Sequence, residues 1–159
     1  MNRSKWLVVP SFALLLTACG DDAPTESAEE DPAEHACEHA GEQGTEVTAS
    51  DTADSAPELA LSDEPYTVIL TPGSVGYVSL ETPAEALLLA AQADVVTGLF
   101  LDGEELPLGE GAPNEFCAED VPEHFDMDLD EAGTYTLRLG PVGVDSIWLA
   151  YVPAAGHAH

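Results

Sequence analysis

The stretch HFDMDLDEAGTYTLRL, residues 124–139, decides the fold class, because apolar and polar side chains alternate in it on both sides of a short turn. A period of two is typical of a β-strand with one face in a core and the other in water. The side chains expected to point inward are Phe125, Met127, Leu129, Tyr135, Leu137 and Leu139, and those expected to point outward are His124, Asp126 and Asp128. The stretch therefore predicts two strands that contribute to one core.

The same pattern continues upstream and downstream of this stretch, from about residue 65 to residue 153. Pro, Gly and Asp interrupt it at regular intervals, and Thr71-Pro72-Gly73 and Asp102-Gly103 have the composition of turns. Short strands without intervening helices predict an all-β domain over 65–153, an antiparallel β-sandwich of jelly-roll or immunoglobulin-like kind. The expected strands are Tyr66–Leu70, Gly76–Glu81, Ala86–Gln92, Val95–Leu101, His124–Leu129, Thr134–Leu139 and Ser146–Val152.

Three segments of this domain resemble one known family. Asp130–Leu139, with its Ala-Gly-Thr-Tyr phrase, Tyr77–Leu80 and Phe100–Leu106 are similar to the bacterial pre-peptidase C-terminal domain over about residues 66–152. The resemblance implies a β-sandwich in which the Ala-Gly-Thr-Tyr corner opens a late strand, and an accessory module rather than a catalyst. The segment Asn114–Glu123 departs from the family pattern.

The amino terminus has the organisation of an export signal. Asn2–Lys5 is positively charged, and the apolar run Trp6–Leu16 is shorter than the ~20 residues of a membrane span. Leu16-Thr17-Ala18-Cys19 resembles the bacterial lipobox, which implies that residues 1–18 are a signal peptide and that acylated Cys19 holds the protein on a lipid bilayer. Gly20, in place of an aspartate, favours the outer membrane of the cell envelope. An ordinary secretory signal with a chance cysteine is the alternative.

The chain is strongly acidic, with a formal net charge of −28. Cleavage before Cys19 removes Arg3 and Lys5 and leaves Arg138 as the single Lys or Arg against 31 acidic residues. Such a surface repels phosphate, which excludes nucleic acid as a partner and leaves cations as the small ligands that the charge favours.

Residues 19–64 are acidic and contain few large apolar side chains, which predicts a mostly disordered tether. One short helix is expected inside it, over about Pro32–Ala40, because Asp31 can cap it and Gly41 can end it. One face of this helix would carry small side chains able to dock on the domain, Ala33, Ala36, Cys37 and Ala40, and the opposite side would carry His35, His39, Glu38 and Glu42.

Two cysteines remain after acylation of Cys19, namely Cys37 and Cys117. An even number in an oxidising compartment favours a disulfide, which would stabilise so small a domain by ~4 kcal/mol and attach the helix to it. The alternative interpretation makes these thiolates metal ligands, because histidines flank Cys37.

The histidines fall into three groups: His35 and His39, then His124, then His157 and His159 in the tail 154–159. On a helix, residues i and i+4 face the same way, a spacing that allows two imidazoles to bind one Zn²⁺ or Cu²⁺. His124 would share a strand face with Asp126 and Asp128. Metal binding by these five histidines is the first functional hypothesis.

No enzyme is predicted, since the sequence lacks a nucleophile elbow, a His-Glu-x-x-His motif and a phosphate-binding glycine loop. The expected function is that of a non-enzymatic lipoprotein whose histidines bind Zn or Cu. The alternative is a structural or adhesive envelope module that binds a protein or glycan and has no metal role.

Overall fold

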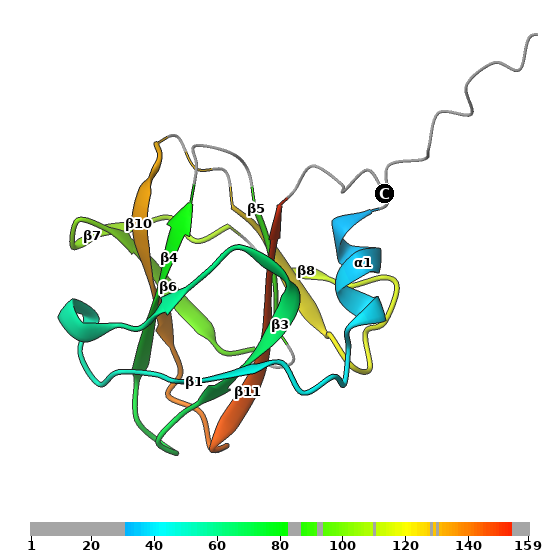
Figure 1. Ribbon diagram of the computed structural model, residues 1–159, viewed down its shortest axis with the longest axis horizontal. Helices are drawn as coiled ribbons and strands as arrows, with labels where there is room; N and C mark the ends of the chain where they lie inside the picture. The colour runs from blue at the N-terminus through cyan, green and yellow to red at the C-terminus, as the bar shows by residue number, and fades with distance from the viewer. Residues whose placement is uncertain are drawn as a thin grey trace, which may run out of the picture.

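The computed structural model describes residues 31–82, 87–91, 94–109, 111–127, 129 and 131–153 (Figure 1). Two open sheets account for its strands. The six-stranded sheet has the order β1 (Thr45–Thr48), β3 (Ser62–Ile69), β11 (Ser146–Pro153), β5 (Leu87–Ala91), β9 (Glu123–Met127) and β8 (Ala112–Pro113). The five-stranded sheet has the order β2 (Glu58–Leu59), β4 (Gly76–Thr82), β10 (Gly133–Leu139), β6 (Val96–Leu101) and β7 (Glu104–Leu106).

The two sheets bury one hydrophobic core between them. Val68 of β3 and Leu149 of β11 enter it from the six-stranded sheet, and Leu80 and Leu137 enter it from β4 and β10. All side chains expected to point inward from residues 124–139 are buried, namely Phe125, Met127, Leu129, Tyr135, Leu137 and Leu139. The prediction of an all-β domain is confirmed, and each expected strand is present to within four residues of its predicted bounds.

The sheets are not wholly antiparallel, because a segment expected to be a disordered tether joins both of them. Within residues 45–64 the structure has β1, the 3₁₀ turn η1 (Ala53–Ser55), β2 and the start of β3. β1 pairs in parallel with β3, and β2 pairs in parallel with β4. These short edge strands contain few apolar residues, yet Leu59 is completely buried in the core. Backbone pairing with a preformed neighbour stabilises them, which their own composition does not predict.

The turns predicted from composition are also present. Asp102 and Gly103, with φ of 51° and 81°, connect β6 to β7. Two consecutive left-handed residues make the tight hairpin turn whose twist matches that of the strands. In the other turn, Ser74 N donates to the Thr71 carbonyl oxygen at 3.0 Å.

The predicted helix exists as α1 (Pro32–Glu38) and ends two residues early. Its N-terminus is capped by Asp31, whose Oδ1 accepts from Ala33 N at 2.8 Å. Its small face docks on the outer side of the six-stranded sheet, where Ala36 packs against Trp148 and Ala150 of β11 (Figure 1).

The disulfide between Cys37 and Cys117 is present and confirms the predicted pairing. It attaches the end of α1 to the loop that precedes β9. Asn114 in the same loop is fully buried and donates from Nδ2 to the Ala33 carbonyl oxygen at 3.4 Å. The helix is therefore fixed to the domain by a covalent bond, a hydrogen bond and apolar packing.

Replacing both Cys37 and Cys117 by serine should lower the free energy of unfolding by up to about 4.5 kcal/mol, because the bridge closes a loop of 80 residues. Urea denaturation followed by far-UV circular dichroism measures the change. The wild-type protein in dithiothreitol serves as the control and should match the double variant. An unchanged midpoint under both conditions would contradict a stabilising bridge.

Tyr151 of β11 is completely buried, and this burial raises the pKa of its hydroxyl to about 12, although a hydrogen bond with Thr82 acts in the opposite direction. Between pH 10 and 12 the unfolded chain should lose this proton while the folded protein keeps it. The free energy of unfolding should therefore be unaffected below pH 10 and should fall between pH 10 and 12 by about 1.4 kcal/mol for each pH unit. Urea midpoints recorded from pH 9 to 12 should show this fall in the wild type and a smaller one in Tyr151→Phe; equal slopes would refute it.

Candidate functional site

The outer face of the five-stranded sheet carries two partly exposed aromatic side chains. The alternation that buries Val78 and Leu80 in β4 turns Tyr77 outward, and Phe100 lies on the same face of β6. Thr136 of β10 lies between their strands, directly opposite Phe100 in the register. Because neighbouring strands are about 4.8 Å apart, the strands that carry Tyr77 and Phe100 are separated by about 10 Å.

A groove of about 240 Å³ occupies this space and is lined by Tyr77, Phe100 and Thr136, together with Ala53, Asp54 and Gly103. We call the hollow formed by these residues the aromatic groove. One of its walls is η1, and the opposite end is the β6–β7 turn that contains Gly103. Segments distant in sequence thus combine two rings, a hydroxyl and a carboxylate in one depression.

Backbone hydrogen bonds hold the wall formed by η1 against Tyr77. Ser50 N donates to the Tyr77 carbonyl oxygen at 3.0 Å, and Tyr77 N donates to the Ser50 carbonyl oxygen at 2.8 Å. The hydroxyls of Thr52 and Ser55 lie 2.6 Å apart and tie the turn to itself. Asp54 is therefore held on a short, internally bonded turn beside the aromatic ring.

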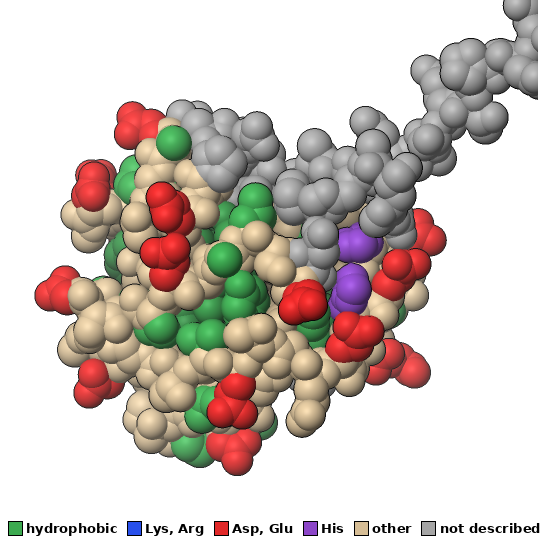
Figure 2. All heavy atoms as spheres, viewed as in Figure 1, with side chains coloured by type: hydrophobic (Ala, Val, Ile, Leu, Met, Phe, Trp, Pro, Cys, Tyr) green, Lys and Arg blue, Asp and Glu red, His purple; other side chains and the backbone are tan. Residues whose placement is uncertain are grey.

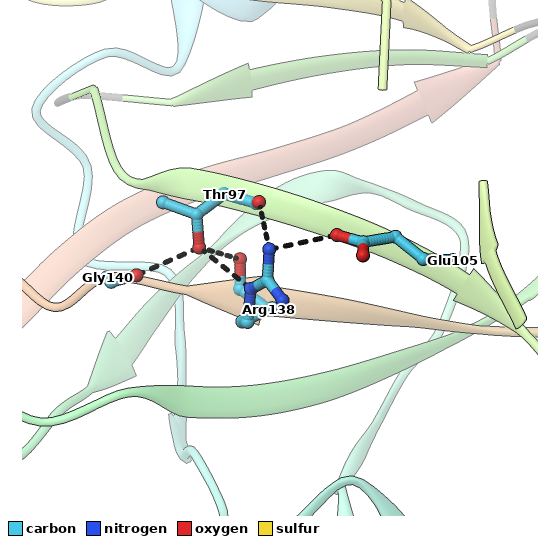
Figure 3. Close-up of polar contacts among 4 residues, drawn as sticks. All are labelled: Thr97, Glu105, Arg138 and Gly140. Carbon is cyan, nitrogen blue, oxygen red and sulfur yellow. Dashed lines mark hydrogen bonds and ion pairs between the residues drawn. The ribbon is translucent and has the colours of Figure 1, made fainter. Parts of the chain in front are cut away.

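Arg138, the single Lys or Arg among the described residues, lies next to the aromatic groove and is engaged on several sides (Figure 3). Its Nη2 donates to the Thr97 carbonyl oxygen at 2.7 Å and to Glu105 Oε1 at 3.0 Å. The guanidinium carbon lies 5.2 Å from the centre of the Phe100 ring, a cation–π distance. The opposing residue in β6 is Gly98, where a Cβ atom would be only 2.9 Å from Nη2. The charge of Arg138 is thus compensated by Glu105.

The structure brings His35 and His39 together but corrects the position predicted for His35. Their ring centroids are 5.1 Å apart, as the i, i+4 spacing predicts. His39 Nδ1 lies 3.0 Å from Glu42 Oε2. His35, however, is only 7% exposed and does not lie on an open face with the glutamates. Because this short helix is bonded to the 114–122 loop at Ala33 and Cys37 and packs on the sheet, it is enclosed on more than the face that its periodicity predicts.

The other predicted ligands are not gathered around this pair. His124 lies on β9 between Ala90 of β5 and Ala112 of β8. Cys37 and Cys117 are bonded to each other, so the interpretation of these thiolates as metal ligands is wrong for this structure. Among the residues described, no three His, Cys, Asp or Glu side chains form a group that could hold a metal ion. The predicted positions that lie outside the described residues are Cys19, Asp128, His157, His159 and the Asp126 side chain.

A second hollow, of about 430 Å³, opens between the sheets near the β6–β7 hairpin. It is lined by the core residues Leu99, Leu129 and Tyr135, by Leu101 and Leu106 at the margin of the core, and by Pro107 and Glu131. The Tyr135 hydroxyl is used within the fold, since it donates to the Glu131 carbonyl oxygen at 2.6 Å. Because several of its lining residues belong to the core, whereas Tyr77 and Phe100 lie on an outer sheet face, we take the aromatic groove as the candidate site.

The aromatic groove was not predicted from the sequence, although one signal for it was present there. The alternation that predicts Val78 and Leu80 as core residues also predicts an outward Tyr77. Such a residue marks a binding surface only where other apolar side chains lie beside it, and the sequence alone does not place Phe100 near Tyr77. The position of η1, which brings Asp54 to the aromatic groove, depends on the pairing of residues 45–64 with distant strands. No local sequence pattern predicts it.

No protein-family model and no curated protein sequence matches this chain. Within the described ranges, no helix is both long enough and apolar enough to cross a membrane.

Proposed function

We propose that this protein is a non-enzymatic bacterial lipoprotein, held on the outer membrane through acylated Cys19, whose domain binds a protein or glycan of the cell envelope in the aromatic groove. We further propose that the two open sheets are a β-sandwich of jelly-roll or immunoglobulin-like kind. The observation that carries the binding proposal is the pair Tyr77 and Phe100, which flank Thr136 on an outer sheet face. Aromatic side chains of this kind contribute much of the binding energy at interfaces.

The position of α1 supports display of the groove away from the lipid. α1 is the first described element after Cys19, and it packs on β11 and β5 of the six-stranded sheet. The groove opens on the other sheet, and Figure 1 has β4, β10 and β6 on the side of the molecule away from α1. Residues 19–30 can span at most about 40 Å when fully extended. A tether that enters the domain at α1 would place the aromatic groove on the side of the domain away from the lipid, where partners can reach it.

The charge of the surface supports a domain held away from the lipid. Figure 2 shows acidic side chains spread widely over the face in view. Repulsion between this surface and anionic lipid headgroups would keep the domain off the bilayer and leave the acyl chains as the attachment. The same repulsion supports the expectation that nucleic acid is not a partner.

Binding of Zn or Cu by the histidines is the second candidate. The 5.1 Å separation of the His35 and His39 rings favours it. The burial of His35 opposes it, because it restricts approach of a metal ion to this ring, and within the described residues no group of three His, Cys, Asp or Glu side chains could complete a site. We therefore place metal binding below partner binding.

The anchor is tested by phase partition of the full-length protein made in bacteria. The wild type should enter the detergent phase, because two or three acyl chains add ~0.8 kcal/mol for each buried methylene. Cys19→Ala should remain in the aqueous phase. Cys117→Ser is the control and should partition as the wild type does. A wild-type protein found wholly in the aqueous phase would exclude lipid attachment.

Partner binding is tested by cosedimentation of the protein with peptidoglycan and, separately, with envelope proteins. Tyr77→Ala and Phe100→Ala should each weaken the dominant interaction at least tenfold, or about 1.4 kcal/mol, as expected for interface aromatics. Phe116→Ala is the matched control, since Phe116 is 50% exposed but lies outside the groove. Binding that both groove variants retain at full strength would remove the groove from the proposal.

A further inference from the structure

We propose that the aromatic groove binds the side chain of a lysine carried by a partner protein, with the ammonium group beside Asp54 and the methylene chain between Tyr77 and Phe100. This inference rests on the proposed function, because it requires the groove to be the binding site. It specifies a lysine side chain as the group that enters the aromatic groove, and a protein rather than a glycan as the partner.

The size of the groove favours one long side chain. Its volume of about 240 Å³ is below the ~300 to 1,000 Å³ typical of small-molecule pockets. Tyr77 and Phe100 both line this hollow, so an alkyl chain that enters it lies between the two side chains. Lysine has an unbranched chain of this kind that ends in a compact charge.

The lining of the groove favours a positive charge. Aromatic faces attract ammonium groups electrostatically, most strongly when the group is partly removed from water. Asp54 adds a carboxylate at the wall formed by η1, and the paired hydrogen bonds between Ser50 and Tyr77 fix that wall beside the ring. Tyr77 and Asp54 thus favour a cation, whereas the Phe100 ring, which already interacts with the Arg138 guanidinium at 5.2 Å, provides apolar contact for the methylene chain.

The remaining charges of the domain disfavour an anion. Arg138 is the one described Lys or Arg, and its contacts with Glu105, Thr97 and Phe100 engage it within the sheet. An anionic ligand would find no other such side chain in the described part of the domain and would meet the field of a chain with net charge −28. The same field raises the local concentration of a cationic partner and its rate of association. Charge complementarity thus identifies a basic protein as the occupant.

The full-length lipoprotein in nonionic detergent micelles is titrated with three probes, and binding is followed by NMR. The first is acetyl-Gly-Lys-Gly-amide, the second is the same peptide acetylated on the lysine Nε atom, and the third is a neutral disaccharide. The lysine peptide should bind at least tenfold more tightly than its acetylated form. Asp54→Asn should weaken it about fivefold, and Tyr77→Ala should reduce it at least tenfold.

Asp51→Asn is the matched control. It removes a carboxylate charge only three residues from Asp54, but the Asp51 side chain lines a different hollow. It should leave the affinity for the lysine peptide nearly unchanged. Equal loss in Asp51→Asn and Asp54→Asn would overturn the inference, since binding would then reflect only the general negative field.

Two further outcomes separate this inference from the proposed function. Equal affinity for the lysine and acetyl-lysine peptides, or Tyr77-dependent binding of the disaccharide alone, would overturn the lysine site and leave the groove as a binding site. Binding of the lysine peptide that is insensitive to both Tyr77→Ala and Phe100→Ala would overturn the lysine site and the groove together.

Discussion

The register of β10 between β4 and β6 is the constraint on which the rest of the structure depends. It places Tyr135 and Leu137 in the core and, by the same alternation, Thr136 and Arg138 on the outer face. A slip of one residue would exchange these two sets and bury a guanidinium where leucine now packs. The pairing of β10 with β4 and β6 therefore determines both which of its side chains enter the core and which lie on the face of the aromatic groove.

The extent to which the sequence predicts this structure follows from how local each signal is. Residues 124–139 contain their own period of two, so these strands and their buried faces are predictable without knowledge of their neighbours. The capping of α1 is equally local. β1 and β2 are not predictable in this way, because Val47 and Leu59 are almost their only apolar side chains and a parallel neighbour supplies the rest. Asp54 reaches the groove only as a consequence of that pairing.

Arg138 is the single Lys or Arg among the described residues that compensates an acidic side chain. Within an overwhelmingly acidic chain, Arg138 neutralises Glu105 and contacts the ring of Phe100. An exposed ion pair of this sort contributes little to stability. Its larger effect is local: an arginine that lies over one aromatic ring limits the positions available to that ring. The orientation of Phe100, which lines the aromatic groove, is thus linked to Arg138.

The Cys37–Cys117 bond would have a mechanical consequence for the proposed attachment through Cys19. Tension between the tether and the chain beyond Cys117 would pass from Cys37 directly to Cys117, so the segment between them would carry none of it. Asp54, Tyr77 and Phe100 all belong to that segment. A partner bound at these residues would load that segment itself, and the bond would then limit how far the segment can be extended, because both of its ends are held at one point.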